Sequence, residues 1–319
     1  TFAVDQAMLD TGGQISVQGA GNIEKGWLRI ALMDPDNQEA WSGGEFGGEY
    51  SFNTYIQPKK VGVYRWIARW TGETAGSFDL AYQALGLSAL ALLSGAGMVL
   101  VALAFGFFAF RRNRDISAKA KWGYLALGAL AWVVTVLVKF AVAIPLNPIV
   151  YNAIGSADAL WSPGNLLLYV YIGSLTGFTE VLLTWLLLRY TRLGRAPWGK
   201  ALAFGIGFGA VEALLLGVSN LASVATAISA PRYIDAQTLA SLAALNNPVY
   251  SLAPVVERLA TICVHILCCL LLFYGVATHQ ARWMWVSFAF KTALDSVAAF
   301  AQFWGVETLS KLWTIEAII

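Results

Sequence analysis

The chain has 319 residues, of which 58% are apolar and only 13% are charged. Soluble domains usually carry about a quarter charged residues, so this composition argues against a soluble globular protein and indicates one embedded in a bilayer. The net charge of +2 and the absence of a basic tract interleaved with aromatic residues argue against a nucleic-acid partner.

Residues 1–82 read as a water-soluble segment of short alternating strands separated by turns. The clearest strand-like runs are residues 14–18, 27–33, 50–56, 63–70 and 77–82. Leu28, Ile30 and Leu32 fall on one face, and Asp34-Pro35-Asp36-Asn37 predicts the turn that follows. Roughly seven short strands at this spacing resemble an immunoglobulin-like or GOLD-like β-sandwich. No catalytic group stands out here, so a binding or spacer domain is the expectation.

From residue 85 the chain consists mainly of long apolar runs. A hydrocarbon layer of about 30 Å needs roughly 20 apolar residues in a helix. Six runs satisfy this length: residues 85–110, 122–144, 166–188, 201–224, 253–278 and 283–305. Residues 313–319 are apolar but too few to cross, and are expected to begin a seventh helix. The predicted fold is therefore an α-helical membrane bundle of six to seven spans over residues 85–319, preceded by the β-sandwich of residues 1–82.

The distribution of Lys and Arg predicts the orientation of this bundle. Basic residues gather in the loops after the first, third and fifth spans: Arg111, Arg112, Arg114, Lys119, Lys121, Arg189, Arg192, Arg195, Lys200 and Arg282. The alternate loops carry almost none, with Arg232 as the exception. We therefore expect the basic loops on the cytoplasmic side of a cytoplasmic membrane and the β-domain outside. Because the chain begins at Thr1 and not Met, removal of a signal peptide is expected.

Several ionisable residues lie near the middle of the predicted spans, where each is costly. They are Glu180, Glu212, His265, Lys291 and Asp295, whereas Lys139 is nearer the outer end of its span, from which a lysine can snorkel. Lys291 and Asp295 are four residues apart and can pair on one helical face. Arg258 and His265, seven apart, also share a face. Two readings are open: interhelical structural pairing, or a site assembled from four helices at one depth.

The surroundings of these residues resemble the motifs of YhfC-type glutamic intramembrane proteases, which are relatives of the CAAX-processing membrane proteases. Four segments carry the resemblance: Gly177-Phe178-Thr179-Glu180, residues 204–213 ending in Val211-Glu212-Ala213, Glu257-Arg258 with His265-Ile266, and Lys291 with Asp295. Their order and spacing cover residues 85–319, without the β-domain. The resemblance implies that a glutamate activates water for peptide-bond hydrolysis while histidines bind a metal or stabilise the oxyanion. It maps onto Glu180, Glu212, His265 and Asp295.

The same motifs depart from the family pattern at catalytic positions. Val181 replaces the second of two adjacent glutamates, and Thr184 or Trp185 replaces an arginine. Phe208 and Lys291 replace two histidines. Phenylalanine cannot ligate a metal, and a lysine beside Asp295 is expected to pair with it. We therefore predict an incomplete ancestral site, with no metal and no cofactor.

The leading functional hypothesis is a non-catalytic binding or accessory subunit of a membrane complex. Its expected partners are membrane lipids and proteins that contact the β-domain and the bundle. The alternative is a residual intramembrane peptidase that uses Glu180 or Glu212 with His265. A second alternative is an ion or proton pathway through the same residues and Asp295. Gly205, Gly207 and Gly209 do not form a phosphate-binding loop and are expected to allow close helix packing.

Overall fold

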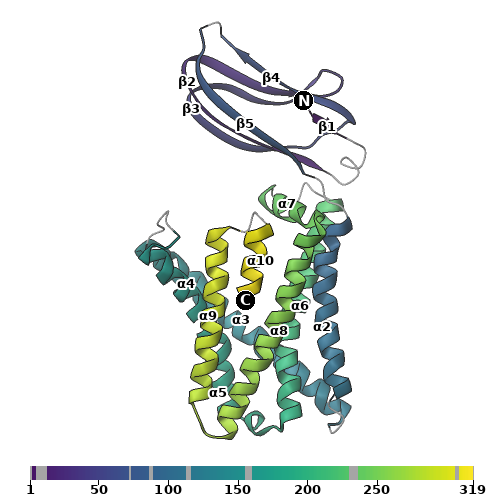
Figure 1. Ribbon diagram of the computed structural model, residues 1–319, viewed down its shortest axis with the longest axis vertical. Coiled ribbons are helices and arrows are strands. Elements are labelled where there is room, and N and C mark those ends of the chain that lie inside the picture. Colours follow the sequence, from purple (N-terminus) through teal and green to yellow (C-terminus); the bar gives the residue numbers. More distant parts are fainter. Residues whose placement is uncertain are drawn as a thin grey trace. The chain divides into compact units, whose positions relative to one another are not determined.

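The computed structural model describes residues 2–4, 13–71, 73–85, 89–112, 116–154, 160–229, 236–305 and 309–318. The chain divides into two compact units, Thr1–Leu93 with Asn220–Ser251 and Ser94–Ser219 with Leu252–Ile319. The first unit contains an antiparallel sheet, and most of the membrane-length helices belong to the second (Figure 1). This architecture confirms the predicted fold class. The domain boundary between residues 82 and 85 stays a prediction.

The sheet contains five strands in the described residues, fewer than the roughly seven expected. The strands are β1 (Phe2–Val4), β2 (Gln14–Met33), β3 (Glu39–Ile56), β4 (Gly62–Trp70) and β5 (Ala75–Leu85). The strand count is lower because β2 joins two runs that the sequence analysis separated. The order is β1-β4-β2-β3, and β5 pairs with β2 as well. The first part of β2 pairs with β5, and the last part of β2 pairs with β4. On its other edge, β2 pairs with β3 along almost the whole length of β2.

A β-bulge within β2 explains how one strand serves both parts of the sheet. The pairing register shifts between Ile23 and Leu28, around Gly26, whose φ of 80° suits glycine. Because side chains alternate along a strand, the shift moves the buried face from odd to even positions. The large buried side chains are those of Ile15, Val17 and Ile23 before the bulge and Leu28, Ile30 and Leu32 after it. Leu32 packs in one cluster with Ile15 and Val17, so the sheet folds over a common apolar core.

The predicted turn after β2 is present and is tied to a second loop by an ion pair. The backbone N–H of Asn37 donates to the carbonyl oxygen of Asp34 over 3.0 Å. Lys60 Nζ lies 2.7 Å from Asp34 Oδ2, and the backbone N–H of Gln38 donates to Asp34 Oδ1 over 2.8 Å. The hydrogen bond from Lys60, followed by that from Gln38, lowers the pKa of Asp34.

The helical part consists of long helices joined by short segments. The helices are η1 (Ala89–Ala91), α2 (Leu92–Arg112), α3 (Ala118–Ile154), α4 (Pro163–Thr176), the π-helical η2 (Gly177–Leu182), α5 (Leu183–Tyr190), η3 (Arg192–Arg195), α6 (Trp198–Ser229), α7 (Ala236–Ala243), η5 (Ala244–Asn246), α8 (Pro248–Ala277), α9 (Arg282–Trp304) and α10 (Leu309–Ile318). Five stretches in the described residues are long and apolar enough to cross a membrane: Ala89–Ala109, Ala118–Ile154, Pro163–Tyr190, Trp198–Ser229 and Pro248–Ala277.

The sixth predicted span corresponds to α9, a helix of 23 residues. It is not among the five apolar spans because Lys291 and Asp295 lower its hydropathy. The last predicted element, at residues 313–319, falls on the ten-residue helix α10. Six spans were predicted, and five stretches among the described residues are apolar enough to cross a membrane. The charged residues of α9 account for this difference, and the same residues belong to the candidate site.

Glycines of α6 allow close approach of two neighbouring helices, as predicted. A Cβ atom on Gly207 would lie 2.0 Å from the carbonyl oxygen of Leu125 on α3. On the α8 side, a Cβ on Gly205 would lie 3.1 Å from the Cα of Ile266, and one on Gly209 would lie 3.0 Å from the Cα of Ile262. Backbones that approach so closely leave no space for a side chain, and such small-residue contacts are typical of membrane helices.

We expect Gly207→Ala to lower the free energy of unfolding by about 1–3 kcal/mol, because the added methyl group forces α3 and α6 apart. Gly123→Ala on α3 is the matched control, since a Cβ there meets no atom within 4 Å. Alanine favours a helix over glycine by about 0.5–1 kcal/mol, so the control should be neutral or slightly stabilised. Thermal unfolding in detergent checks both variants. Equal melting temperatures would show that the helix contact is not tight.

Candidate functional site

The ionisable residues of the helical unit form two groups, each drawn from distant parts of the sequence. The Glu180 cluster consists of Lys139, Glu180, Lys291 and Asp295. The Glu212 cluster consists of Glu212, Glu257, Arg258 and His265. All four residues proposed from the sequence, Glu180, Glu212, His265 and Asp295, are thus in one cluster or the other.

In the Glu180 cluster, two lysines and two carboxylates alternate. Lys139 Nζ lies 3.1 Å from Glu180 Oε1, and Lys291 Nζ lies 3.6 Å from Glu180 Oε2. Lys291 Nζ also lies 3.4 Å from Asp295 Oδ1, which confirms the predicted pair on one face of α9. The Lys291 ammonium therefore stands between two carboxylates. Because these groups are largely shielded from bulk water, removal of one partner would leave an uncompensated charge.

Lys139, whose position would allow it to snorkel, instead has a partner within the protein. Its side chain is only 24% exposed, and its ammonium group contacts Glu180 on η2. The Glu180 carboxylate compensates the charge of the lysine, which would otherwise have to reach water to be hydrated. Lys139 was therefore the member of the cluster that sequence reasoning missed. The feature of the sequence that could have identified Lys139 is that it is the one charged residue within an otherwise apolar run.

Glu180 lies on a π-helical turn that connects α4 and α5. Such turns insert one extra residue into a helix and occur frequently at functional sites. Two glycines bring this segment close to α9. A Cβ on Gly173 would lie 2.3 Å from the carbonyl oxygen of Thr292, and one on Gly177 would lie 2.4 Å from Thr292 Oγ1. This close packing allows the side chain of Lys291 to reach Glu180.

In the Glu212 cluster, one carboxylate is engaged at both oxygens. Arg258 Nη1 donates to Glu212 Oε1, and Nη2 of the same guanidinium donates to Glu257. His265 Nε2 lies 2.8 Å from Glu212 Oε2. Because Arg258 and His265 both reach Glu212, their predicted placement on one face of α8 is confirmed. The guanidinium fork suits two carboxylates at once.

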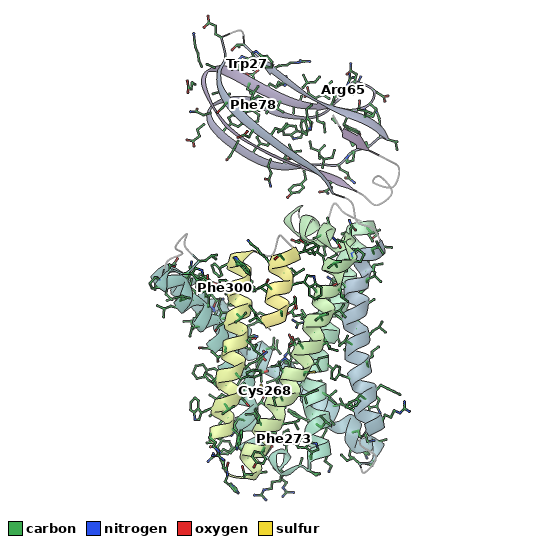
Figure 2. All side chains as sticks on the ribbon, viewed as in Figure 1. Trp27, Arg65, Phe78, Cys268, Phe273 and Phe300 are labelled. Atoms are coloured by element: carbon green, nitrogen blue, oxygen red, sulfur yellow. The ribbon has the colours of Figure 1, made fainter. Side chains whose placement is uncertain are left out.

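A small cavity of about 10 Å³ lies between the clusters. That is close to the minimum space for one water molecule. It is lined by Glu180, Val181, Phe208, His265, Cys268, Cys269, Leu272 and Lys291. The Phe208 ring lies 5.2 Å from the His265 ring, centroid to centroid. Cys268 is labelled within the helices in Figure 2 and is buried. Glu180 and His265 therefore face one site, but an aromatic ring and a lysine share it.

The donor set does not fit a catalytic metal ion. Among the residues that the structure describes, no group of three His, Cys, Asp or Glu side chains is arranged to hold one. The Lys291 ammonium lies near both carboxylates of its cluster, and Arg258 engages Glu212. A catalytic zinc needs three such ligands and an open position, and a neighbouring cation opposes its binding. The arrangement can instead neutralise buried charge and orient a histidine–glutamate pair.

A family model described as YhfC intramembrane metalloprotease matches residues 98–319 of the chain. The matched residues include both clusters and leave out the sheet. No curated protein and no solved structure matched.

Proposed function

Because the chain belongs to the YhfC intramembrane metalloprotease family, we propose that it is a non-catalytic member whose bundle and β-region bind other membrane proteins. The observation that carries the proposal is the position of Lys291, whose ammonium group lies 3.6 Å from Glu180 and 3.4 Å from Asp295. An internal cation there neutralises the carboxylates that a metal ion would need.

The second cluster supports the same conclusion. A glutamate that acts as a general base needs a free oxygen within reach of a water molecule. Both oxygens of Glu212 are engaged, one by Arg258 and the other by His265. Phe208 against His265 offers no donor to an oxyanion. The polar residues thus act as interhelical pairs that stabilise one arrangement of the bundle.

The β-region supplies the surface for a partner. Two aromatic side chains on its strands are exposed, Trp70 on β4 at 61% and Phe78 on β5 at 43%. Exposed aromatic residues are enriched in protein interfaces. In our proposal the basic loops are cytoplasmic and the β-region is extracytoplasmic, where it binds an ectodomain of a membrane complex.

The absence of metal chemistry can be tested directly. We expect the chain, purified in detergent with zinc supplied during growth, to contain far less than one equivalent of metal by elemental mass spectrometry. A chelator should leave its melting temperature unchanged, since Lys291 and not a metal compensates the buried carboxylates. One tightly bound metal per chain, lost together with stability on chelation, would overturn the proposal.

The binding role has its own experiment. The chain is expressed at native level, purified in mild detergent, and examined for a companion of fixed stoichiometry by mass spectrometry. Trp70→Glu should lose that companion without lowering the melting temperature of the chain. Glu45→Gln, on the exposed part of β3, is the control. A chain that travels alone contradicts the accessory role.

One observation favours a residual peptidase as the second candidate. His265 and Glu212 approach to 2.8 Å beside the small cavity, as an acid–base pair would. Cleavage of membrane-embedded peptides in liposomes, abolished by Glu212→Gln and by His265→Ala, would establish this activity. Unchanged cleavage in both variants would assign any activity to a contaminant.

A further inference from the structure

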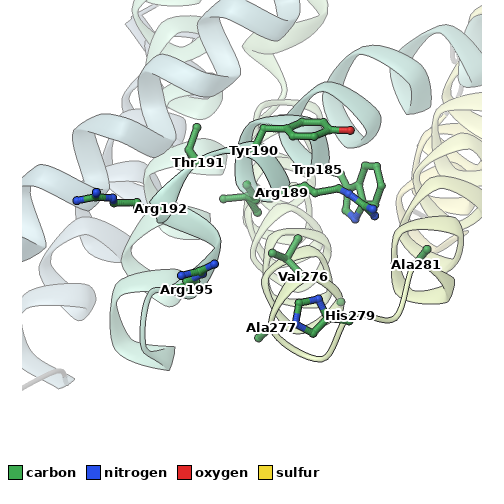
Figure 3. Close-up of a pocket in the computed structure, with 12 residues that line it drawn as sticks. Trp185, Arg189, Tyr190, Thr191, Arg192, Arg195, Val276, Ala277, His279 and Ala281 are labelled. Carbon is green, nitrogen blue, oxygen red and sulfur yellow. The ribbon is translucent and has the colours of Figure 1, made fainter.

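A large basic pocket lies at one end of the helical unit, away from both ion-pair clusters. Its volume is about 810 Å³, and it is formed where α5, η3 and the end of α8 meet (Figure 3). The arginines Arg189, Arg192 and Arg195 line it together with His279. Its apolar wall includes Leu188 and Val276. The pocket therefore combines positive charge with an apolar surface.

The charge of the pocket is not compensated within the described part of the chain. Among the described residues, no Asp or Glu lines it, and no ion pair involves any of its three arginines. The Arg189 guanidinium lies 4.8 Å from the centre of the Trp185 ring, which orients it without neutralising it. All three arginines are exposed, so their guanidinium groups are accessible to an anion, which would gain charge-assisted hydrogen bonds from them.

The backbone around the pocket is built compactly. A Cβ on Gly194 would lie 2.4 Å from the carbonyl oxygen of Leu188, so the η3 turn packs closely against the end of α5. The hydroxyl of Thr191 accepts a hydrogen bond from the backbone N–H of Leu193 and caps that turn. Arg189, Arg192 and Arg195 recur every third residue. The three arginines thus lie on one short segment, with Arg189 directed toward Trp185 and Arg192 away from it (Figure 3).

The pocket is located at headgroup depth. Two apolar spans, Pro163–Tyr190 and Pro248–Ala277, end at it. The ends of membrane-spanning helices meet the layer of lipid headgroups. Basic pockets between such helix ends bind the headgroups of acidic lipids, and arginine is suited to phosphate because it donates two parallel hydrogen bonds.

We propose that this pocket binds the phosphate of an anionic phospholipid headgroup. Arg192 and Arg195 are the main ligands of the phosphate, and the apolar wall around Val276 contacts the glycerol and the acyl chains of the lipid. A free phosphate shares the charged chemistry but would gain nothing from the apolar wall. The inference does not depend on whether the ion-pair clusters are catalytic, because none of their residues lines this pocket.

The full chain in neutral detergent is titrated with phosphatidylglycerol, phosphatidylcholine or inorganic phosphate, and binding is followed by native mass spectrometry. We expect phosphatidylglycerol to bind at least tenfold more tightly than phosphatidylcholine. Arg192→Gln combined with Arg195→Gln should weaken phosphatidylglycerol binding by about tenfold or more, since each basic residue contributes roughly fivefold at a membrane surface.

The matched control is Arg111→Gln combined with Lys119→Gln, which removes the same charge from the exposed residues of another basic loop. Its affinity should stay within about twofold of that of the parent chain. An equal loss of phosphatidylglycerol affinity in both double variants would show general charge attraction and would contradict a specific site. If inorganic phosphate binds as tightly as phosphatidylglycerol and displaces it, the pocket is a site for free phosphate and the lipid proposal is wrong. Circular dichroism and lipid-free melting temperatures confirm that every variant is folded.

Discussion

Replacing Lys291 by methionine is expected to lower the free energy of unfolding by about 3–5 kcal/mol, the usual cost of removing one partner from a buried ion pair. The Lys291 side chain is 8% exposed and compensates both Glu180 and Asp295. Methionine fills a similar volume without charge, so two carboxylates would remain with Lys139 alone. Equilibrium unfolding in mixed detergent micelles measures the loss.

A charge-balanced double variant separates this effect from packing. In Lys291→Met combined with Asp295→Asn, Glu180 is the one carboxylate that remains in the cluster, and Lys139 is its cation. We expect the double variant to regain most of the stability that the single variant loses, because it removes one negative charge together with the positive one and leaves no uncompensated buried charge. If both variants are equally unstable, lost packing and not charge explains the result.

The second large effect is expected at Arg258, which joins Glu212 on α6 to Glu257 on α8. Arg258→Met leaves both carboxylates without their shared cation and should also cost about 3–5 kcal/mol. Arg258→Lys should cost less, since an ammonium keeps the charge, but it cannot reproduce the two-pronged contact of the guanidinium. The same unfolding experiment measures both changes.

Arg111→Met serves as the reference for these measurements, since Arg111 is exposed at the end of α2. Surface substitutions usually change stability by less than about 0.5 kcal/mol. A loss at Arg258 no larger than the loss at Arg111 would contradict the buried contact. A loss equal for methionine and lysine would show that the fork geometry, and not the charge alone, carries the stability.

Local sequence patterns predicted the features that depend on residues near one another in the chain. Leu28, Ile30 and Leu32 are buried on one face because side chains alternate along any strand. Lys291 pairs with Asp295 because residues four apart share a helical face. The glycines of α6 permit close packing wherever they contact another helix. Each of these rules needs only a few consecutive residues.

The differences arose where a local signal was misleading. Residues 14–18 and 27–33 were predicted as two separate strands, yet both runs lie inside β2, as do Gly19 and Gly21 between them. These glycines make room for neighbours, since a Cβ on Gly19 would lie 2.3 Å from the Phe52 ring and one on Gly21 would lie 2.3 Å from the carbonyl oxygen of Ser77. Two short strands therefore became one long strand. Only the pairing across the sheet identifies a glycine of this kind.

The sequence by itself determined that the chain is a membrane protein of this family, since long apolar runs and ordered motifs are properties of the chain alone. The tertiary structure decided which charge compensates which. Glu180 pairs with Lys139 across 41 positions, and Glu212 pairs with Arg258 across 46. Periodicity relates residues a few positions apart on one helix, whereas a contact between helices depends on how their backbones pack. The physical state of the site, a set of carboxylates neutralised by lysine and arginine, follows from that packing.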